Sequence, residues 1–498
     1  MTARQFWKIM PYASLGEFIA ELQDNGELIR IAAQVDSALE LAAITDRVGR
    51  TSPNGGPALL FENVKNSTIP VVTNLLGSRR RLCRSLGVAD LDDVSANLDR
   101  RLQSEQPSGW LDSLRLVPGW GGLGKWTPKS VKTAACQQVV RLGRDVNLWD
   151  LPVPRSWPDE PHPVITSGQM VTRHPVTGNS HLSQSPLVVI NPQELAWYDG
   201  KHDQTSIVQL AVESKQNLPV AISLGGDPAL CLSSTLSATV DSRLFAGFLR
   251  GASLELVRCR TNELDVPAGA EIIIEGYIDA ENSKTNSLVS IARGNGRYVS
   301  RELPLIHVTA ITHRANPVFP AMITTAPLSE EAWISLATER MLLPVLKRLL
   351  PEIADIHRPF CAAGRNLLFV SIHKCADFQA RRVLHALWGM ESLGQTKIII
   401  IVDADQDIHQ EEQVWFTVGT NACPTRDFVF SDGLARDDDY TPAAMSLASR
   451  VGIDATRKRM IESSHVWPQS LTMSDEIVAR VRERWAEYGL EERMKAEG

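Results

Sequence analysis

A series of short β-branched segments in the middle of the chain most strongly limits what this sequence can fold into. Turn residues separate these segments, which are VITSGQMVTRH, PLVVINP, LPVAISLGG, LELVRCR, AEIIIEGYI and LIHVTAITHR. Repeated strands with few helices between them are typical of a barrel or a sandwich. We therefore expect a β-rich central region over residues 121–325.

The two flanking regions predict α/β structure, and a chain of 498 residues has room for two or three domains. Residues 1–120 contain SLGEFIAELQDNG, in which Ser14 caps a helix, Glu17 follows three residues later and Asn25-Gly26 ends it. Residues 326–498 alternate helical and strand patterns and end in a charged amphipathic helix. Terminal helices of this kind often pack on a partner subunit.

Two internal helices are also expected. DSRLFAGFLRG interrupts the strands of the central region, and Gly251 is its expected C-terminal cap. EEAWISLATERMLLPVLKRLL predicts a long amphipathic helix, which the strands LLFVSIH and KIIIIV follow. Strands that alternate with helices in this order predict a layered sheet with helices packed on it.

Composition and charge exclude several classes of protein. Hydrophobic residues make up 43% and charged residues 22%, as in ordinary globular proteins, and the net charge of -7 opposes nonspecific binding to nucleic acid or acidic lipid. No apolar run approaches the length of about 18 residues that a membrane span needs. The N-terminus lacks an apolar signal segment, and the seven cysteines form no CxxC pair. We expect a cytoplasmic protein with reduced thiols.

Three motifs have both a functional and an ordinary interpretation. SLGGDPA (223–229) places two glycines after a strand, where backbone N–H groups can approach a phosphate, and CLSSTLS (231–237) adds four hydroxyls. Each also fits an ordinary turn. Asp403, Asp405 and Asp407 alternate after a strand, which fits either a divalent cation site or a polar strand end.

Two histidines with polar neighbours suggest a metal site. His181 lies in GNSHLSQSP and His202 lies in DGKHDQ, both within the β-rich region. Imidazole suits transition metals, and the third ligand would be a carboxylate, for which Asp241 is the candidate. The alternative is that both are unrelated surface histidines.

Segments over nearly the whole chain carry a resemblance to a known family. They are GGPALLFENVKN (55–66), ACQQVV (135–140), DLPVPRSWPDE (150–160), SLGGDPA (223–229), FAGFLRGASLELVRCRTNELDVPAGAEIIIEGYI (245–278), TKIIIIVDADQDI (396–408) and VGIDATRK (451–458). In this order the chain resembles the UbiD family of prenylated-flavin-dependent decarboxylases, and the segment 245–278 is the most specific.

The resemblance implies an α/β multidomain fold whose central domain is a split β-barrel related to flavin reductases. It also implies a homo-oligomer, either a dimer or a hexamer, in which the last helix engages a partner. The implied cofactor is prenylated FMN, supplied by a flavin prenyltransferase, with a divalent metal and K+ at its phosphate. Because Thr166, Ser167, Ser233 and Ser234 lie in family-matching, Gly/Ser-rich turns, we expect them near that phosphate.

The metal ligands of the family are an Asn, a His and a Glu, and this sequence departs from two of them. His181 takes the Asn position without a gap, whereas a two-residue shift brings Asn179 there; His202 matches the His in both registers. The Glu position is Ser242, with Asp241 beside it. A set of His181, His202 and Asp241 would be softer than the family's and would favour Fe2+ over Mn2+.

The catalytic Glu–Arg–Glu network of the family is also absent. The Arg position falls on Pro186 without a gap and on Gln184 with the shift, and the loop that normally holds both acids reads NSKTNSLVSIARGNGRY (282–298). That loop contains Arg293 and Arg297, which we predict to bind anionic groups of a substrate. The sequence identifies no catalytic acid.

Two functions follow from the resemblance. The first is nonoxidative decarboxylation of an aromatic acid, with an ortho-carboxy aryl-CoA thioester such as phthaloyl-CoA giving benzoyl-CoA and CO2. This substrate would place the chain in the phthaloyl-CoA decarboxylase branch of anaerobic aromatic breakdown, where the thioester carbonyl can accept electron density. The second is a catalytically degenerate paralogue that binds flavin or serves as an accessory subunit.

Overall fold

The computed structural model describes residues 12–103, 126–198, 207–235, 241–282, 284–285, 287–293, 296–325, 329–362, 366–390, 392–434, 447–463, 466–469 and 471–489. Within these, residues up to 374 together with 380–456 form one compact unit, and residues 375–379 with those from 457 onwards form a second. The domain boundary expected near residue 120 lies outside the described residues.

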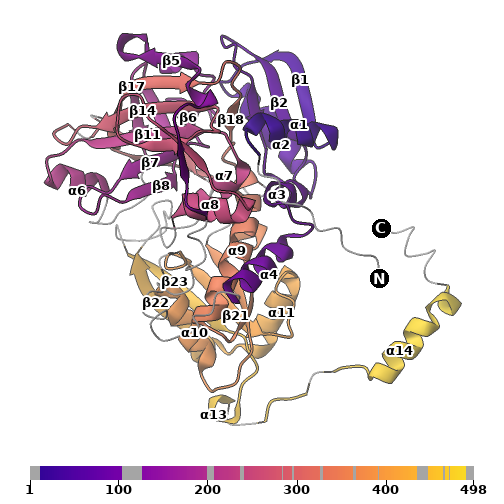
Figure 1. The fold of residues 1–498 in the computed structure, drawn as a ribbon. Helices are drawn as coiled ribbons and strands as arrows, with labels where there is room; N and C mark the ends of the chain where they lie inside the picture. Colours follow the sequence, from indigo (N-terminus) through magenta and orange to yellow (C-terminus); the bar gives the residue numbers. More distant parts are fainter. Residues whose placement is uncertain are drawn as a thin grey trace. The chain divides into compact units, whose positions relative to one another are not determined.

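A curled sheet of nine described strands forms the centre of the first unit (Figure 1). In spatial order its strands are β6 (Val164–Ile165), β9 (Leu187–Asn191), β10 (Glu194–Trp197), β17 (Leu305–His313), β14 (Ile272–Ile278), β11 (Leu218–Leu224), β7 (Gln169–Arg173) and β8 (Ser180–Gln184), with β5 (Val139–Leu142) paired to β17. All of these neighbours are antiparallel. The sheet closes only half of a barrel, which confirms the predicted fold class.

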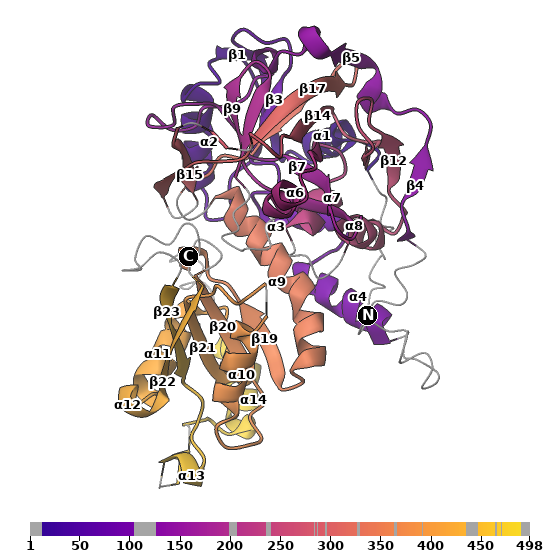
Figure 2. The same ribbon diagram turned by 90° about the vertical axis from the view of Figure 1, so that its left-hand side faces the viewer.

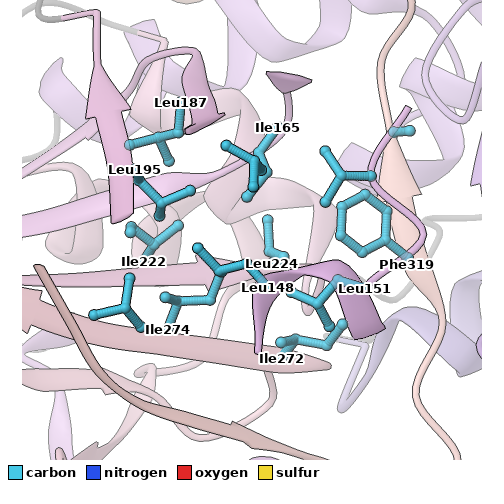
Figure 3. Close-up of a cluster of buried hydrophobic side chains, with 14 of the residues drawn as sticks. Leu148, Leu151, Ile165, Leu187, Leu195, Ile222, Leu224, Ile272, Ile274 and Phe319 are labelled. Carbon is cyan, nitrogen blue, oxygen red and sulfur yellow. The ribbon is translucent and has the colours of Figure 1, made fainter. Parts of the chain in front are cut away.

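Apolar side chains fill the concave side of this sheet (Figure 3). Ile272 and Ile274 of β14 belong to this core, whereas Ile273 between them belongs to a separate core on the other face. Successive side chains of a strand point to opposite faces, so both faces of β14 are buried. The continuous apolar run III is therefore the signature of a strand covered on both sides.

Short elements surround the curled sheet. They are a three-stranded sheet of β13 (Asp265–Pro267), β12 (Glu255–Arg258) and β4 (Lys129–Val131), a hairpin of β15 (Val289–Arg293) and β16 (Arg297–Arg301), helices α6 (Ile207–Glu213), α7 (Pro228–Ser234) and α8 (Ser242–Arg250), and the 3-10 turns η2 (Ala135–Gln137), η3 (Gly143–Asp145) and η4 (Leu148–Asp150). Gly251 caps α8 with a left-handed φ of 69°, as predicted. Helices α7 and α8 lie next to each other (Figures 1 and 2).

A second sheet joins distant parts of the chain. Its strands are β1 (Leu28–Val35), β2 (Ala58–Val64), β3 (Val71–Thr73) and β18 (Phe319–Ala321), with helices α1 (Leu15–Asp24), α2 (Glu40–Arg50), α3 (Arg79–Leu86) and α4 (Leu91–Gln103) in the same region. Strand β18 follows the strands of the curled sheet in sequence but pairs in parallel with β3. The N-terminal region and the central sheet therefore share one apolar core.

The predicted N-terminal helix is confirmed, and its cap is testable. The hydroxyl of Ser14 accepts a hydrogen bond from the N–H of Glu17 at 3.3 Å, and the Glu17 carboxylate accepts one from the N–H of Ala13 at 2.8 Å. Replacing Ser14 with Ala should cost about 1 kcal/mol of helix stability. Hydrogen exchange in the first turn of α1 should then become about fivefold faster; unchanged exchange would show that the cap contributes nothing.

The C-terminal sheet has five described strands and is covered on both faces. In order they are β19 (Ile353–His357), β20 (Leu367–Ile372), β21 (Ile398–Asp403), β23 (Leu447–Asp454) and β22 (Phe428–Leu434), with helices α10 (Gln379–Trp388), α11 (Glu411–Asn421) and α12 (Pro424–Asp427) and the turn η5 (Phe360–Ala362). Leu368 and Ile399 pack with α10, whereas Phe369 and Ile400 pack with α11. This alternation produces the predicted layered arrangement.

The predicted long helix is present as α9 (Glu330–Leu349), but it is more buried than an amphipathic helix with one apolar face would be. Fourteen of its 20 residues are buried, because it packs against α3, α4 and α7 as well as β19. A helix that is buried nearly all round lacks a wide solvent face. No helix among the described residues is both long enough and apolar enough to cross a membrane.

The second unit contains α13 (Met460–Ser463), α14 (Asp475–Glu483) and the turn η6 (Trp485–Tyr488). The predicted terminal helix is present as α14, which ends at Glu483, and the last part of that prediction, residues 490–498, lies outside the described residues. None of the residues of α14 is buried, and Val478 and Val481 are exposed. Its predicted contact with a partner subunit stays a prediction.

Candidate cofactor and active site

A cavity lies where the curled sheet meets β18 and the first turn of α9. It contains about 520 Å³ of empty space, part of which is open to solvent. Its lining residues are Leu15, Val72, Leu75, Leu76, Ser167, Gln169, Gln184, Gly225, Gly226, Asp227, Pro228, Cys231, Pro320, Ala321, Met322, Glu330 and Ile334. Mostly apolar walls with a few convergent polar groups are typical of cofactor sites.

The SLGGDPA turn forms one wall of the cavity. Gly225 and Gly226 have φ values of +74° and +101°, and a Cβ on Gly225 would lie 2.7 Å from Cγ of Glu271. Only glycine fits there without strain. The next residue, Asp227, caps α7 by accepting a hydrogen bond from the N–H of Ala229 at 2.8 Å. The turn therefore brings backbone directly to the cavity surface.

Gln184, at the end of β8, connects two walls of the cavity. Its Nε2 donates to the carbonyl of Thr166 at 3.4 Å, and its Oε1 accepts from Sγ of Cys231 at 3.8 Å. Burial raises the pKa of the Cys231 thiol to about 12, with a further contribution from the charge of Glu330. Cys231 therefore remains a protonated thiol at neutral pH and is a poor nucleophile.

Two residues before β7 join the cavity to β18. The hydroxyl of Ser167 donates to the carbonyl of Pro320 at 2.6 Å, and that of Thr166 accepts from the N–H of Met322 at 3.0 Å. Ser167 itself lines the cavity, and Thr166 lies beside it. The two hydroxyls thus position β18, the strand of the N-terminal sheet that comes from much later in the sequence.

Glu330 begins α9 and lines the cavity. Its Oε1 accepts a hydrogen bond from the N–H of Leu76 at 2.6 Å, whereas its Oε2 is buried and has no hydrogen-bond partner among the described residues. Burial raises the pKa of Glu330 to about 7, although backbone hydrogen bonds and the charge of Arg81 oppose this rise. A carboxyl group with this pKa can donate a proton near neutral pH.

The other two residues predicted near a phosphate lie on α7. Ser233 and Ser234 are buried, and their hydroxyls donate to the carbonyls of Leu230 and Cys231 at 3.0 and 2.7 Å. Neither is among the residues that line the cavity. Contact with a phosphate would require these hydroxyls to leave their present partners.

The three predicted metal ligands are described to different extents. His181 lies in β8 opposite Thr172, but its side chain is not described, and His202 lies outside the described residues. Asp241 caps α8 and forms a two-point ion pair with Arg243, at 3.1 Å to Nε and 2.9 Å to Nη2. Burial would raise the pKa of Asp241, but the hydrogen bonds and charge of Arg243 lower it below the ordinary value.

The position of Gln184 helps to distinguish the two possible alignments of this chain with the family, one without a gap and one with a two-residue shift. Gln184 is the residue that the shifted register puts in place of the family arginine, and it lines the cavity. Pro186, its counterpart without a gap, does not line the cavity; its carbonyl accepts a hydrogen bond from the N–H of Tyr198. Asn179, the corresponding partner of Gln184, lies just before β8 and is exposed.

Arg293 and Arg297 face each other across the β15–β16 hairpin. The guanidinium of Arg293 lies over the ring of buried Tyr198, 4.8 Å from its centroid, and that of Arg301 lies at the same distance. Neither Arg293 nor Arg297 is among the residues that line the cavity. If they bind substrate, they bind a part of it that extends beyond the cavity.

Sequence analysis missed Glu330 and Gln169. Acidic residues are common in the first turn of any helix, so Glu330-Glu331 looked like an ordinary helix start. Gln169 is buried in β7, where its Oε1 accepts from the Ser223 hydroxyl at 3.2 Å. The one signal available for Glu330 is the apolar sequence that follows it. Burying a carboxyl group in the first turn of a helix costs free energy, which suggests a function for the residue.

Models of one family match three successive parts of the chain. The 3-octaprenyl-4-hydroxybenzoate carboxy-lyase N-terminal domain matches residues 19–100, the Rift-related domain of the same enzyme matches 129–327, and its C-terminal domain matches 332–455. These are the UbiD domain models, and together they cover most of the chain. The cavity is formed by residues of all three matched regions, apart from Leu15 and Glu330.

Individual proteins agree with the family models. An uncharacterized protein of Aquifex aeolicus is 36% identical over 489 residues, covering 96% of this chain and 99% of that protein. An evolved dimeric form of the UbiD-class enzyme HmfF from Pelotomaculum thermopropionicum, solved with prFMN, is 25% identical with a TM-score of 0.73 and covers 93% of this chain and 97% of its own.

The closed form of vanillic acid decarboxylase from Sedimentibacter hydroxybenzoicus shares the fold, with a TM-score of 0.83 at 24% identity over 97% of this chain and 99% of its own. The agreement extends through the three largest described sheets, because nearly the whole of each chain is covered. The protein belongs to the UbiD family.

Proposed function

We propose that this protein is a nonoxidative, prenylated-FMN-dependent decarboxylase of an aromatic acid, and that the cavity below the curled sheet is its cofactor and substrate site. The observation that carries the proposal is the protonatable carboxyl group of Glu330 in a cavity of about 520 Å³. Such a pairing of an apolar pocket with a perturbed carboxyl group is typical of an active site.

The residues present fit a flavin. The two glycines of the SLGGDPA turn allow close approach, and Val72, Leu75 and Ile334 offer apolar surface to a planar ring. Thr166, Ser167, Ser233 and Ser234 are our proposed neighbours of its phosphate. Prenylated FMN, when bound, supplies an electron sink for the pair released as CO2 leaves.

Glu330 would serve as the proton donor that the sequence does not reveal. Its unpaired Oε2 is available to carry the proton, while the Leu76 N–H holds Oε1 in place. Gln184, where the family has an arginine, offers a neutral amide and therefore does not hold a nearby carboxylate in its charged form. The loss of the usual network is thus compatible with proton transfer from another wall of the cavity.

The proposed substrate is an ortho-carboxy aryl-CoA thioester such as phthaloyl-CoA. Its thioester carbonyl stabilises negative charge on the ring, which lessens the need for a strong acid network. The phosphates of CoA would bind Arg293 and Arg297, which lie in the β15–β16 hairpin and do not line the cavity. Mn2+ or Fe2+, with K+, would complete the cofactor-phosphate site, with His181, His202 and Asp241 as proposed ligands.

Alanine at Arg293 or Arg297 is expected to weaken substrate binding. Loss of a charge-assisted hydrogen bond to a phosphate costs about 1.5–3 kcal/mol, which corresponds to a KM roughly 10- to 150-fold higher with an unchanged kcat. The measurement is steady-state kinetics with phthaloyl-CoA. An unchanged KM in both variants would assign these arginines to the hairpin and to Tyr198 alone.

The alternative function, an accessory subunit, rests on the same missing Glu–Arg–Glu network. A subunit of that kind would bind an active homologue and would not need a mature cofactor. The test incubates the full-length chain, produced together with a flavin prenyltransferase, with phthaloyl-CoA under nitrogen and follows benzoyl-CoA. Turnover supports the enzyme; no turnover of phthaloyl-CoA or of simple aryl acids, with co-purification of an active homologue, supports the subunit.

A further inference from the structure

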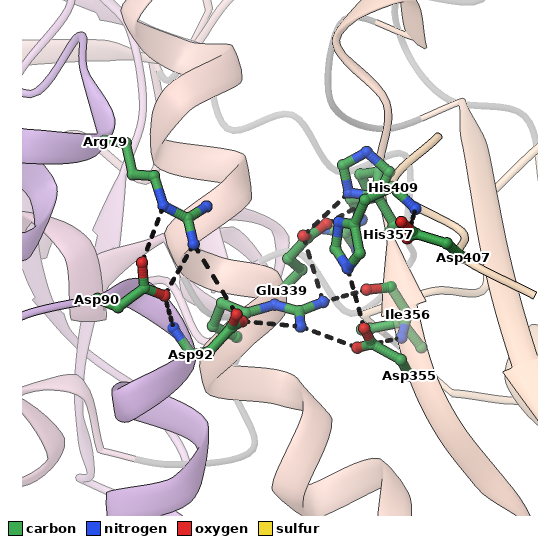
Figure 4. Close-up of polar contacts among 11 residues, drawn as sticks. Arg79, Asp90, Asp92, Glu339, Asp355, Ile356, His357, Asp407 and His409 are labelled. Carbon is green, nitrogen blue, oxygen red and sulfur yellow. Dashed lines mark hydrogen bonds and ion pairs between the residues drawn. The ribbon is translucent and has the colours of Figure 1, made fainter. Parts of the chain in front are cut away.

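Two histidines and one glutamate converge in the C-terminal part of the first unit (Figure 4). Glu339 comes from the middle of α9, His357 ends β19, and His409 lies in the loop after β21. Each offers one ligand atom, and these atoms lie within 4.8 Å of one another. Two imidazoles and a carboxylate form a ligand set that divalent transition metals prefer.

The spacing of the first pair already suits a metal ion. Oε1 of Glu339 lies 3.2 Å from Nδ1 of His357. Ligand atoms around a tetrahedral zinc ion lie about 3.4 Å apart, because each is about 2.1 Å from the metal. The ligand atom of the third residue, His409, lies within 4.8 Å of the other two, on the exposed side of the cluster.

Neighbouring groups hold Glu339 and His409 in position. The N–H of Arg358 donates to Oε2 of Glu339 at 2.6 Å, which leaves Oε1 directed at His357. Nε2 of His409 donates to Asp355 at 2.9 Å, so Nδ1 is the nitrogen that keeps its lone pair. A carboxylate that orients the far nitrogen of a histidine is the usual second layer of a metal site.

Charge and burial also favour a cation at this place. Glu339 is fully buried and His357 nearly so, whereas His409 opens the cluster to solvent. Arg340 forms ion pairs with Glu339 at 3.3 Å and Asp355 at 2.8 Å, and it shares its charge with Asp92 at 3.3 Å. Asp92 also pairs with Arg79 at 3.9 Å, and Arg79 with Asp90 at 2.8 Å, so four carboxylates face two guanidinium groups, which leaves an excess of negative charge for a further cation.

We propose that Glu339, His357 and His409 bind a divalent transition-metal ion, with water in the remaining coordination position on the exposed side. The ion would join three segments that are far apart in sequence: the middle of α9, the end of β19 and the loop after β21. The site is distinct from the cofactor cavity and does not depend on the proposed decarboxylase function.

Titration with Co2+ tests this site. The full-length chain with His202→Ala, which removes a proposed ligand of the cofactor-phosphate metal, is stripped with a chelator and titrated. We expect about one equivalent of Co2+ to bind with visible absorption bands, and Zn2+ to displace it with loss of those bands. Adding His357→Ala or His409→Ala should weaken Co2+ binding by at least about a hundredfold.

His385→Ala is the matched control, because His385 is an exposed histidine of the same region that lies outside the cluster. It should leave Co2+ affinity unchanged. His409→Ala removes an exposed side chain, so it tests binding without disturbing the buried pair. The proposal is overturned if His357→Ala and His409→Ala bind Co2+ as tightly as the control, or if His202→Ala alone abolishes all binding. If the purified protein lacked prenylated flavin, the proposed function would be contradicted, whereas the result of the Co2+ titration would still stand.

Discussion

Replacing Glu330 with glutamine is expected to lower the turnover number by about 10²–10⁴-fold, the usual contribution of a positioned general acid. Glutamine has the same shape and can still accept the hydrogen bond from the Leu76 N–H. It cannot deliver a proton, however. Flavin content and the melting temperature should therefore stay near the wild-type values while product formation from phthaloyl-CoA falls.

The pH profile gives the same prediction a second readout. Because the pKa of Glu330 is raised to about 7, the donating form predominates below that pH and disappears above it. The wild-type turnover number should therefore be constant at lower pH and fall as the pH rises through about 7. The residual activity of Glu330→Gln should lack this decline.

Glu331→Gln is the matched control, since Glu331 is the next residue of the same helix and does not line the cavity. It should retain the wild-type turnover number and the wild-type pH profile. If Glu330→Gln keeps full activity, or if both variants lose it equally, the proton comes from another group.

Replacing Cys231 with phenylalanine is expected to abolish flavin binding. The Cys231 side chain lies in the cavity wall, with its sulfur 3.8 Å from Oε1 of Gln184. A phenyl ring at this position would occupy space that the flavin needs, and overpacking would cost about 1–3 kcal/mol of stability. The measurement is the flavin absorbance of protein produced together with the prenyltransferase, compared at equal protein concentration.

Cys231→Ser is the control that distinguishes blocking of the cavity by a large side chain from loss of the thiol group. Serine is small and can still donate to Gln184, so this variant should bind flavin as the wild type does. Circular dichroism must show that Cys231→Phe is folded. A folded Phe variant with full flavin content would place the flavin elsewhere in the protein.

Much of the fold follows from local patterns in the sequence. Ser14, Glu17 and Gly26 define both ends of α1, because capping hydrogen bonds and a left-handed glycine depend on only a few neighbouring residues. The run III of β14 and the run IIIIV of β21 are strands, as expected, and the structure shows that both are covered on both faces. All of these features depend only on residues that are close together in the sequence.

The candidate site could not be predicted in the same way, because it is formed by segments that only the tertiary fold brings together. Burial raises the pKa of Glu330, and the Leu76 N–H that binds its carboxylate, and so opposes this rise, comes from more than 250 positions earlier in the chain. Likewise, the burial of α9 cannot be predicted from its own apolar pattern, because elements from three regions of the chain cover it. Resemblance to the family suggested which catalytic residues are absent, and only the structure shows that Glu330 lines the cavity.

The convergence of Glu339, His357 and His409 illustrates the same limit. Sequence analysis examined Asp403, Asp405 and Asp407 in the loop after β21. In the structure, the Asp407 carboxylate instead accepts hydrogen bonds from the His409 N–H at 3.0 Å and the Gln410 side chain at 2.9 Å. Spacing within a loop does not reveal which of its residues faces a distant helix.

The most direct test of the central claim, that this cavity holds the cofactor of a UbiD-family enzyme, is the identity of the flavin in the purified protein. The chain should be produced together with a flavin prenyltransferase, purified under nitrogen, denatured and analysed by mass spectrometry. We predict prenylated FMN at close to one equivalent per chain. A protein without flavin, from cells in which the prenyltransferase is active, would contradict the account.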